Sequence, residues 1–190
     1  MKTSIKIIFL LSIILILFVS CLNKSRDKHK QWKIIAEKTV EQFSGKKMYF
    51  ADTLTRISYN TLDSALVHKG IKPVLKVVVF IDGTCGACLI NLNFWQSFIT
   101  NVYQKRNDCF FYVCVNWQNE MNGTSNPLLD CGFTYSWYLD KNCSLFRSYE
   151  IYDKRLQAVL LDQKNEVLLI GEPSLNSQLG ELYLSTIINY

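Results

Sequence analysis

The most informative segment of this chain is Val77-Val78-Val79-Phe80-Ile81-Asp82-Gly83-Thr84-Cys85-Gly86-Ala87-Cys88. Its first half is a continuous apolar run, which predicts a strand buried at the centre of a sheet. Asp82 and Gly83 then predict a short turn. Apolar side chains recur at helical spacing over residues 89–95, so the two cysteines are expected where a helix begins.

The position of Cys85 and Cys88 at the start of a helix has a chemical consequence. A helix N-terminus offers partial positive charge and free backbone N–H groups, and both favour a thiolate over a thiol. Two thiols separated by two residues can also close a small disulfide. The segment therefore predicts thiol–disulfide exchange at these two cysteines.

The first twenty residues predict an export signal. Lys2 and Lys6 are the only charges before an apolar run over residues 7–19 that a single serine interrupts. The run is shorter than the roughly 20 apolar residues of a membrane-spanning helix, and its basic start suits a signal peptide. A cysteine that follows a serine at the end of the run resembles the lipobox of bacterial lipoproteins. That resemblance implies removal of residues 1–20 and a lipid on Cys21. An ordinary signal peptide and a short uncleaved anchor are the alternatives.

The domain organisation follows from this signal. We expect a tether and N-terminal extension over residues 21–73 and one domain over residues 74–190. The formal net charge of +5 falls to +3 when Lys2 and Lys6 are lost, because no acidic residue precedes Cys21. This surplus is too small to indicate nucleic-acid binding. The domain is expected in the cell envelope, lipid-anchored to a membrane and facing the periplasm or the cell surface.

The pattern after Pro73 predicts a β-α-β unit, a connection, a β-hairpin and a closing helix. Strands are expected at 74–81, 109–115, 134–139, 156–161 and 167–171, and helices at 85–104, 128–131, 144–149 and after Pro173-Ser174. The N-terminal third predicts a helix over 27–43 ended by Gly45, short strands within 47–57 and a short helix over 61–69. One side of the closing helix is expected to be buried through Leu175, Leu179, Leu182, Tyr183, Ile187 and Ile188. The fold class is α/β, with a central mixed sheet flanked by helices and a helical and strand extension at the N-terminus.

Four further cysteines follow the pair. Cys109 and Cys114 lie five positions apart on one predicted strand, so they point to opposite faces and are expected to be small core residues. Cys131 and Cys143 flank a predicted strand and can pair only if their distance allows it.

The order of elements, with Cys-x-x-Cys at the first strand–helix junction, resembles the thioredoxin fold. The stretch that runs from Tyr138-Leu139-Asp140-Lys141-Asn142 to Val159-Leu160-Leu161-Asp162-Gln163-Lys164-Asn165-Glu166-Val167 looks like the second half of membrane-anchored thioredoxin-like proteins of the TlpA/ResA type. The likeness is greatest to thioredoxin-like lipoproteins of Bacteroidetes-type bacteria, and it covers residues 74–190.

The resemblance implies a mechanism. Cys85 attacks a substrate disulfide as a thiolate, and the more buried Cys88 resolves the mixed disulfide. The implied partners are protein thiols and disulfides of the envelope, with an electron donor that the sequence does not identify. The residues implied in substrate docking are Thr84, Gly86, Ala87 and Leu156.

The sequence departs from the family at the site. Thr84 stands where thioredoxins usually have tryptophan, and Ala87 where they often have proline. The family's buried acid falls near Val79, which cannot transfer protons. The family's cis-proline falls near Leu156, and because a non-proline cis bond costs about 2.5–4 kcal/mol, a trans loop is expected there.

Asp82 is the nearest acid to the pair in sequence. It is a candidate for moving the second proton, and its charge is expected to raise the pKa of the thiols. A role as a turn or N-cap residue is the alternative.

The same residues also bear on three other functions, namely a binding module, a metal site and a peroxiredoxin. Without the proline, the domain is alternatively an inactive thioredoxin-like binding module tethered to a membrane. One Cys-x-x-Cys supplies two of the four ligands that a closed zinc site needs, so no metal and no cofactor are expected. A peroxiredoxin fits poorly, because Asp82 stands where those proteins have Thr or Ser. Trp117 is expected near the cysteines or as a plain packing residue.

Overall fold

The computed structural model describes residues 38, 40–49, 54–57, 72–117, 128, 131–140 and 143–190. Contacts divide the chain into a unit over Met1–Gln42 and a unit over Phe43–Tyr190. The expected signal peptide, the lipid site at Cys21 and the helix over 61–69 lie outside the described residues. No helix within the described ranges is long and apolar enough to span a membrane.

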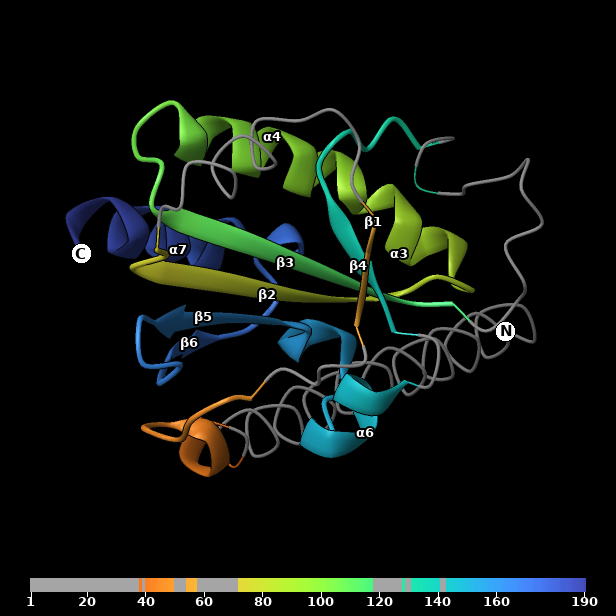
Figure 1. Cartoon of the computed structure of the whole chain (residues 1–190), viewed down its shortest axis with the longest axis horizontal. Coiled ribbons are helices and arrows are strands. Elements are labelled where there is room, and N and C mark those ends of the chain that lie inside the picture. Colours follow the sequence, from red (N-terminus) through yellow and green to blue (C-terminus); the bar gives the residue numbers. More distant parts are fainter. Residues whose placement is uncertain are drawn as a thin grey trace, which may run out of the picture. The chain divides into compact units, whose positions relative to one another are not determined.

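A mixed sheet forms the centre of the second unit (Figure 1). Its six described strands run in the order β1-β4-β3-β2-β5-β6. Their bounds are Thr55–Ile57 for β1, Leu75–Asp82 for β2, Cys109–Asn116 for β3, Trp137–Leu139 for β4, Ala158–Asp162 for β5 and Val167–Ile170 for β6. The pairs β2–β3 and β3–β4 are parallel, and β1–β4, β2–β5 and β5–β6 are antiparallel. The expected mixed sheet with an antiparallel hairpin is confirmed.

Strand β2 is covered on both faces, as its unbroken apolar run predicts. Val77 and Val79 belong to one core cluster, whereas Val78 and Phe80 belong to the other. Successive side chains of a strand point to opposite faces, so a strand covered on both faces needs apolar residues at every position.

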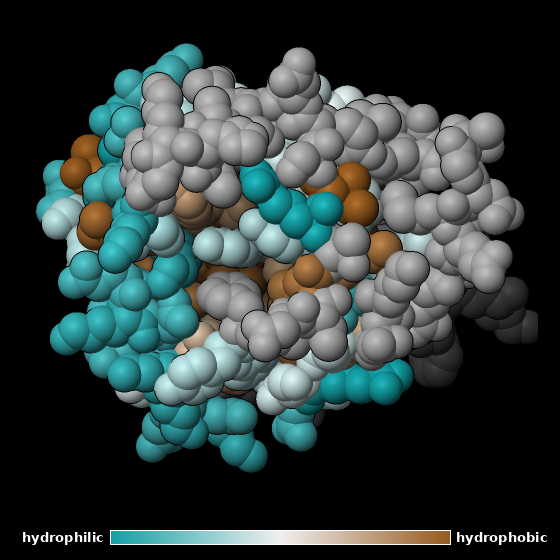
Figure 2. All heavy atoms as spheres, viewed as in Figure 1, coloured by the Kyte–Doolittle hydropathy of each residue, from teal (hydrophilic) through white to brown (hydrophobic). Residues whose placement is uncertain are grey.

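The described helices are α3 (Gly86–Ile90), α4 (Leu92–Tyr103), α6 (Ser144–Tyr149) and α7 (Ser177–Asn189), with 3₁₀ turns η1 (Lys154–Leu156) and η2 (Pro173–Leu175). Residues of α4 and α7 pack in the first cluster, and residues of α6 and the segment 43–48 pack in the second. Helices therefore lie on both faces of the sheet (Figure 1). Figure 2 shows hydrophilic residues over much of the described surface in that view, with apolar residues in smaller patches.

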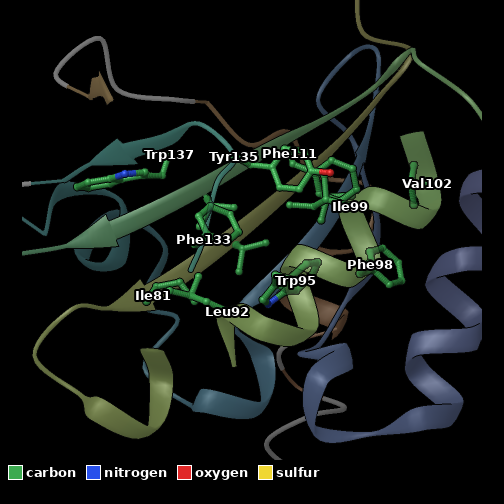
Figure 3. Packing of buried hydrophobic residues seen from close by; sticks show 14 of the residues in the cluster. Ile81, Leu92, Trp95, Phe98, Ile99, Val102, Phe111, Phe133, Tyr135 and Trp137 are labelled. Atoms are coloured by element: carbon green, nitrogen blue, oxygen red, sulfur yellow. The ribbon is translucent and has the colours of Figure 1, made fainter. Parts of the chain in front are cut away.

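The first cluster is built around aromatic rings. Trp95 is fully buried, and its ring lies 5.6 Å from that of Phe98 in an edge-to-face arrangement. Phe98 in turn makes an edge-to-face contact with Phe111 on β3. Figure 3 shows these side chains converging with Leu92 and Ile81 between α4 and the sheet. This packing holds the end of β2 firmly against the start of the helical layer.

The helix expected over 85–104 is divided at Asn91 into α3 and α4. Asparagine has a low helix propensity, and the two segments contact different elements. Helix α3 lies against β2, whereas α4 lies against β3 and α7. A bend at Asn91 lets each segment pack on its own neighbour.

The closing helix buries less than expected. Tyr183 and Ile187 are fully buried, but Leu175, Leu182 and Ile188 are exposed. The expectation that all six apolar residues lie on a buried side is therefore wrong for these three. Leu175 also lies in the 3₁₀ turn before the helix, so it does not share the helical face at all.

Turns end the elements where the sequence predicts them. The helix before residue 44 ends ahead of Gly45, whose φ of 67° is left-handed and favours glycine. In the predicted hairpin, Asp162 Oδ1 accepts the amides of Lys164 and Glu166 at 2.8 and 2.7 Å. The strand expected at 156–161 begins at Ala158, because Leu156 belongs to η1.

Candidate active site

A tight turn places Cys85 at the end of β2. The Asp82 carbonyl accepts the Cys85 N–H at 3.1 Å, and Asp82 Oδ1 accepts the amide and hydroxyl of Thr84 at 3.0 and 2.7 Å. A Cβ at Gly83 would lie 2.5 Å from the Trp117 ring and 2.7 Å from the Asn116 carbonyl, so this position requires glycine. Asp82 is therefore a turn residue, and Trp117 packs against the turn.

The two thiols differ in exposure. Cys85 is the N-cap of α3 and is half-buried, whereas Cys88, one turn further, is only 6% exposed. Both are free thiols. The structure thus brings the two predicted cysteines together, and Cys85, the first in sequence, is the more exposed.

Lys154 lies against the leading thiol although it is far away in sequence. Its Nζ donates to Cys85 Sγ at 3.1 Å. The hydrogen bond from Cys88 lowers the pKa of Cys85 most, and Lys154 lowers it further by a hydrogen bond and by its charge. Cys85 is therefore the thiol that ionises first.

The pKa of Cys88 is shifted in the opposite direction. Burial and the negative charge of Cys85 raise the pKa of Cys88 to about 11, Lys154 offsets part of this, and Asp82 adds a small rise. Asp82 was expected to raise the pKa of the thiols, and it does so for Cys88, where its contribution is the smallest of those named. The pair thus consists of a thiol whose pKa is lowered and a thiol whose pKa is raised.

Replacing Lys154 with glutamine is expected to raise the pKa of Cys85, because a hydrogen-bond donor and a positive charge are both lost. At pH 7 the rate of Cys85 alkylation by iodoacetamide should fall about threefold, a modest factor because the ammonium group is exposed to water. The measurement is the pH dependence of alkylation. Lys164→Gln, an equal charge change in the exposed hairpin, is the control, and an unchanged profile for Lys154→Gln would contradict this assignment.

Two cavities lie beside the pair. The smaller, of about 160 Å³, is lined by Phe80, Ile81, Cys88, Asn91, Lys154, Gln157, Glu172 and Leu175. The larger, of about 320 Å³, is lined by Asp82, Asn116, Cys143, Arg147, Tyr152, Lys154 and Gln157. Lys154 and Gln157 form walls of both.

Glu172 is a buried acid in the smaller cavity. It is 5% exposed, and its Oε1 accepts the Ser174 N–H at 3.1 Å. Burial raises the pKa of Glu172, and the hydrogen bonds from Ser174 offset part of that rise. The indole N–H of Trp95 also lowers this pKa, although it does not reach hydrogen-bond geometry. Val79 on β2 carries no acid, whereas Glu172, after β6, is an acid in the cavity that Cys88 also lines. No local pattern around Gly171-Glu172-Pro173 indicates this placement.

The residues expected to dock a substrate are placed differently. Thr84 and Gly86 are exposed beside Cys85, and Ala87 lies within α3. Leu156 is 5% exposed and packs in the second core cluster, so the structure does not bring it to the thiols. Its neighbours Lys154 and Gln157 lie there instead. All described peptide bonds are trans, as expected for this loop.

The remaining cysteines are not part of the pair. Cys109 and Cys114 lie in different core clusters, which confirms that they face opposite sides of β3. Burial raises the pKa of Cys109 to about 12 and that of Cys114 further. Cys131 and Cys143 are not joined in a disulfide, and the Cys143 thiol donates to Asn116 Oδ1 at 2.8 Å. The described ranges contain no cluster of three His, Cys, Asp or Glu side chains suited to a metal ion.

Comparisons with known proteins establish the fold. No protein-family model and no curated protein matches the sequence. Among solved structures, a thioredoxin-like protein in the oxidised form superposes with a TM-score of 0.53 at 9% identity, over 77% of this chain and 95% of that one. A candidate thiol:disulfide interchange protein DsbE from Chlorobium tepidum gives 0.53 at 14% identity, over 76% and 97%. A candidate thiol–disulfide oxidoreductase from Bacteroides vulgatus gives 0.51 at 12% identity, over 76% and 93%.

By name, one of these structural neighbours is thioredoxin-like, one is a thiol:disulfide interchange protein and one is a thiol–disulfide oxidoreductase. The similarity covers about three quarters of this chain and nearly all of each neighbour. The chain therefore has the expected α/β thioredoxin fold, with a mixed six-stranded sheet between helices.

Proposed function

We propose that this protein is a thiol–disulfide oxidoreductase of the cell envelope that uses Cys85 and Cys88. The observation that carries the proposal is the polarised pair: a half-exposed thiol 3.1 Å from Lys154 Nζ, followed by a buried thiol of raised pKa. A tethered binding module, the alternative function, requires neither the cation nor the difference between the thiols.

In the first step the Cys85 thiolate attacks one sulfur of a substrate disulfide. A bond forms between Cys85 Sγ and that sulfur, and the other substrate sulfur leaves as a thiolate that takes a proton from solvent. Lys154 favours the reactive form of Cys85 before the attack. The half-buried position of Cys85 on the surface turn leaves the sulfur open to a partner.

In the second step Cys88 must lose its proton and attack Cys85 Sγ. The Cys85–Cys88 disulfide forms, and the second substrate sulfur leaves and is protonated. Loss of the negative charge on Cys85 in the mixed disulfide removes one cause of the raised pKa of Cys88. Glu172, in the same small cavity, is the buried carboxylate that we assign as acceptor of this proton.

Glu172→Gln is expected to slow resolution of the mixed disulfide about 10²-fold, the size typical of a lost general base, and to leave the first attack nearly unchanged. Glutamine keeps the oxygen that accepts the Ser174 N–H. Stopped-flow separation of the two steps is the measurement. Equal slowing of both steps would show a structural effect of the substitution instead.

The same substitution has a stability consequence. Because burial raises the pKa of Glu172 above its unfolded value, the folded state binds this proton more tightly, and stability falls as pH rises from about 4.5 through the folded pKa. Glu172→Gln removes this loss, so the variant should be more stable than the wild type at pH 7 but not at pH 4. Denaturant unfolding at both pH values tests the difference.

The function is tested by mixing reduced protein with insulin and following the loss of insulin disulfides. With dithiothreitol as the electron source we expect turnover, and without it we expect one round of reduction that leaves a Cys85–Cys88 disulfide in peptide mapping. The absence of insulin reduction, or a product disulfide at other cysteines, would favour the binding module.

The location is proposed from the N-terminal sequence. Cys21 is proposed to carry the lipid that anchors the domain to a membrane, with protein thiols and disulfides of the envelope as partners. Cells fed a labelled fatty acid should label the full chain but not Cys21→Ala. Labelling of both forms would overturn the anchor.

A further inference from the structure

The larger cavity beside the reactive pair has no part in the two chemical steps. Its walls come from the ends of β2 and β3, from α6 and from the loop that leads into β5. Its volume of about 320 Å³ is at the lower end of ligand pockets, which span roughly 300–1,000 Å³. It therefore has room for one or two residues of a larger partner, or for a small molecule.

Two cations line this cavity. Lys154 is held at the Cys85 sulfur, whereas Arg147 on α6 is exposed and free of ion pairs in the described parts of the chain. The single carboxylate of the lining is Asp82, and its Oδ1 already accepts two hydrogen bonds from Thr84. The lining of this cavity therefore carries a net positive charge.

Two carboxamides complete the lining as donors. Gln157 is 8% exposed, and its side chain makes no hydrogen bond with any described residue although it reaches both cavities. Asn116 Oδ1 accepts the Cys143 thiol, which leaves its two amide N–H groups to donate. The amide of Gln157 therefore faces the cavities, where a ligand that accepts hydrogen bonds can take the place of water.

A guanidinium group and two amides are donors suited to a carboxylate. Because Lys154 forms part of the wall and contacts Cys85 Sγ, an occupant lies next to the sulfur that attacks the substrate. Tyr152, which is largely exposed, adds an aromatic surface at the rim.

We infer that the larger cavity is a substrate subsite for a carboxylate that the disulfide substrate carries close to its reactive cysteine. This inference rests on the proposed function and adds the substrate class. Arg147, Gln157 and Asn116 hold the carboxylate, and Lys154 stays with the thiolate. The carboxylate belongs either to an acidic residue of a polypeptide or to a small disulfide such as glutathione disulfide.

The test compares substrates that differ only in charge. Three otherwise identical peptide disulfides carry Glu, Gln or Lys beside the cysteine, and kcat/KM is measured for each with the full-length protein. A charge-assisted hydrogen bond at a partly exposed site predicts a preference of about fivefold to tenfold for Glu over Gln, with Lys poorest. Glutathione disulfide and its fully esterified form, which has lost its carboxylates, are compared in the same way as a second set of substrates.

Arg147→Gln is expected to reduce the Glu-to-Gln preference to about twofold or less. Lys164→Gln, which removes the same charge from the exposed hairpin, is expected to keep the full preference. Thermal unfolding of both variants shows whether they are folded. The preference should also weaken at high salt.

The outcomes separate the two proposals. Equal kcat/KM for the three peptides, with all of them reduced, overturns the subsite and leaves the oxidoreductase in place. A preference that Arg147→Gln does not change also overturns it. Failure to reduce any of the disulfides overturns the proposed function itself. A preference among the peptides alone supports a polypeptide substrate, and one that extends to glutathione disulfide supports a small disulfide as well.

Discussion

Replacing Cys85 with serine is expected to lower the rate of disulfide reduction by at least about a thousandfold. A serine hydroxyl stays protonated at neutral pH and cannot displace sulfur, whereas the Cys85 thiol has a lowered pKa and a cation beside it. Cys109 and Cys114 cannot substitute, because both are fully buried and burial raises the pKa of each.

Cys88→Ser has a different expected result. The first attack still takes place, but the mixed disulfide is not resolved, so a covalent complex between Cys85 and the substrate accumulates. Non-reducing gel electrophoresis and mass spectrometry detect this complex. Cys131→Ser, at a half-buried and unpaired thiol, is the matched control and should behave as the wild type.

This contrast between the cysteine variants identifies the roles of the two thiols. If Cys88→Ser were inert and Cys85→Ser formed the complex, the assigned order of attack would be reversed. If both variants reduced insulin at the wild-type rate, the pair would have no part in the chemistry.

Trp95→Ala is expected to lower the free energy of unfolding by about 3–5 kcal/mol, the usual range for a deleted buried tryptophan. Trp95 is fully buried and packs edge-to-face against both Phe94 and Phe98. Its ring also joins α4 to the first core cluster, as Figure 3 shows. Its loss leaves a large cavity close to the helix that carries Cys88.

Leu182→Ala on α7 is the control for this prediction. The periodicity of α7 places Leu182 with the buried residues, but it is 47% exposed. Its removal should change stability by no more than about 0.5 kcal/mol. Urea unfolding of both variants is the measurement, and comparable losses would mean that Leu182 is covered in solution or that Trp95 is not a core residue.

The elements predicted from sequence were those with a strong local pattern. Val77–Ile81 is apolar at every position, and such a run predicts a central strand whatever surrounds it. The Cys-x-x-Cys after its turn was correctly placed at a helix start. The division of the helix at Asn91 was missed, because the apolar spacing continues through it and the bend depends on two different packing partners.

The wall of the site opposite the cysteines was predicted less well. Counting along the loop before β5 pointed to Leu156, but η1 turns that side chain into the second core cluster and presents Lys154 and Gln157 to the thiols. A single-residue shift at the end of a strand exchanges inward and outward side chains. Counting from a motif cannot resolve such a shift.

The succession of the core elements along the chain and the place of the cysteine pair at a helix start can be read from local apolar spacing, because these signals act over a few neighbouring residues. The approach of Lys154 to Cys85, across 69 positions, depends on β5 pairing with β2, where the Phe80 N–H donates to the Gln157 carbonyl at 2.8 Å. The placement of Glu172 beside Cys88 likewise depends on the turn that follows β6. These contacts arise from long-range pairing, and no residue near the cysteines in the sequence encodes them.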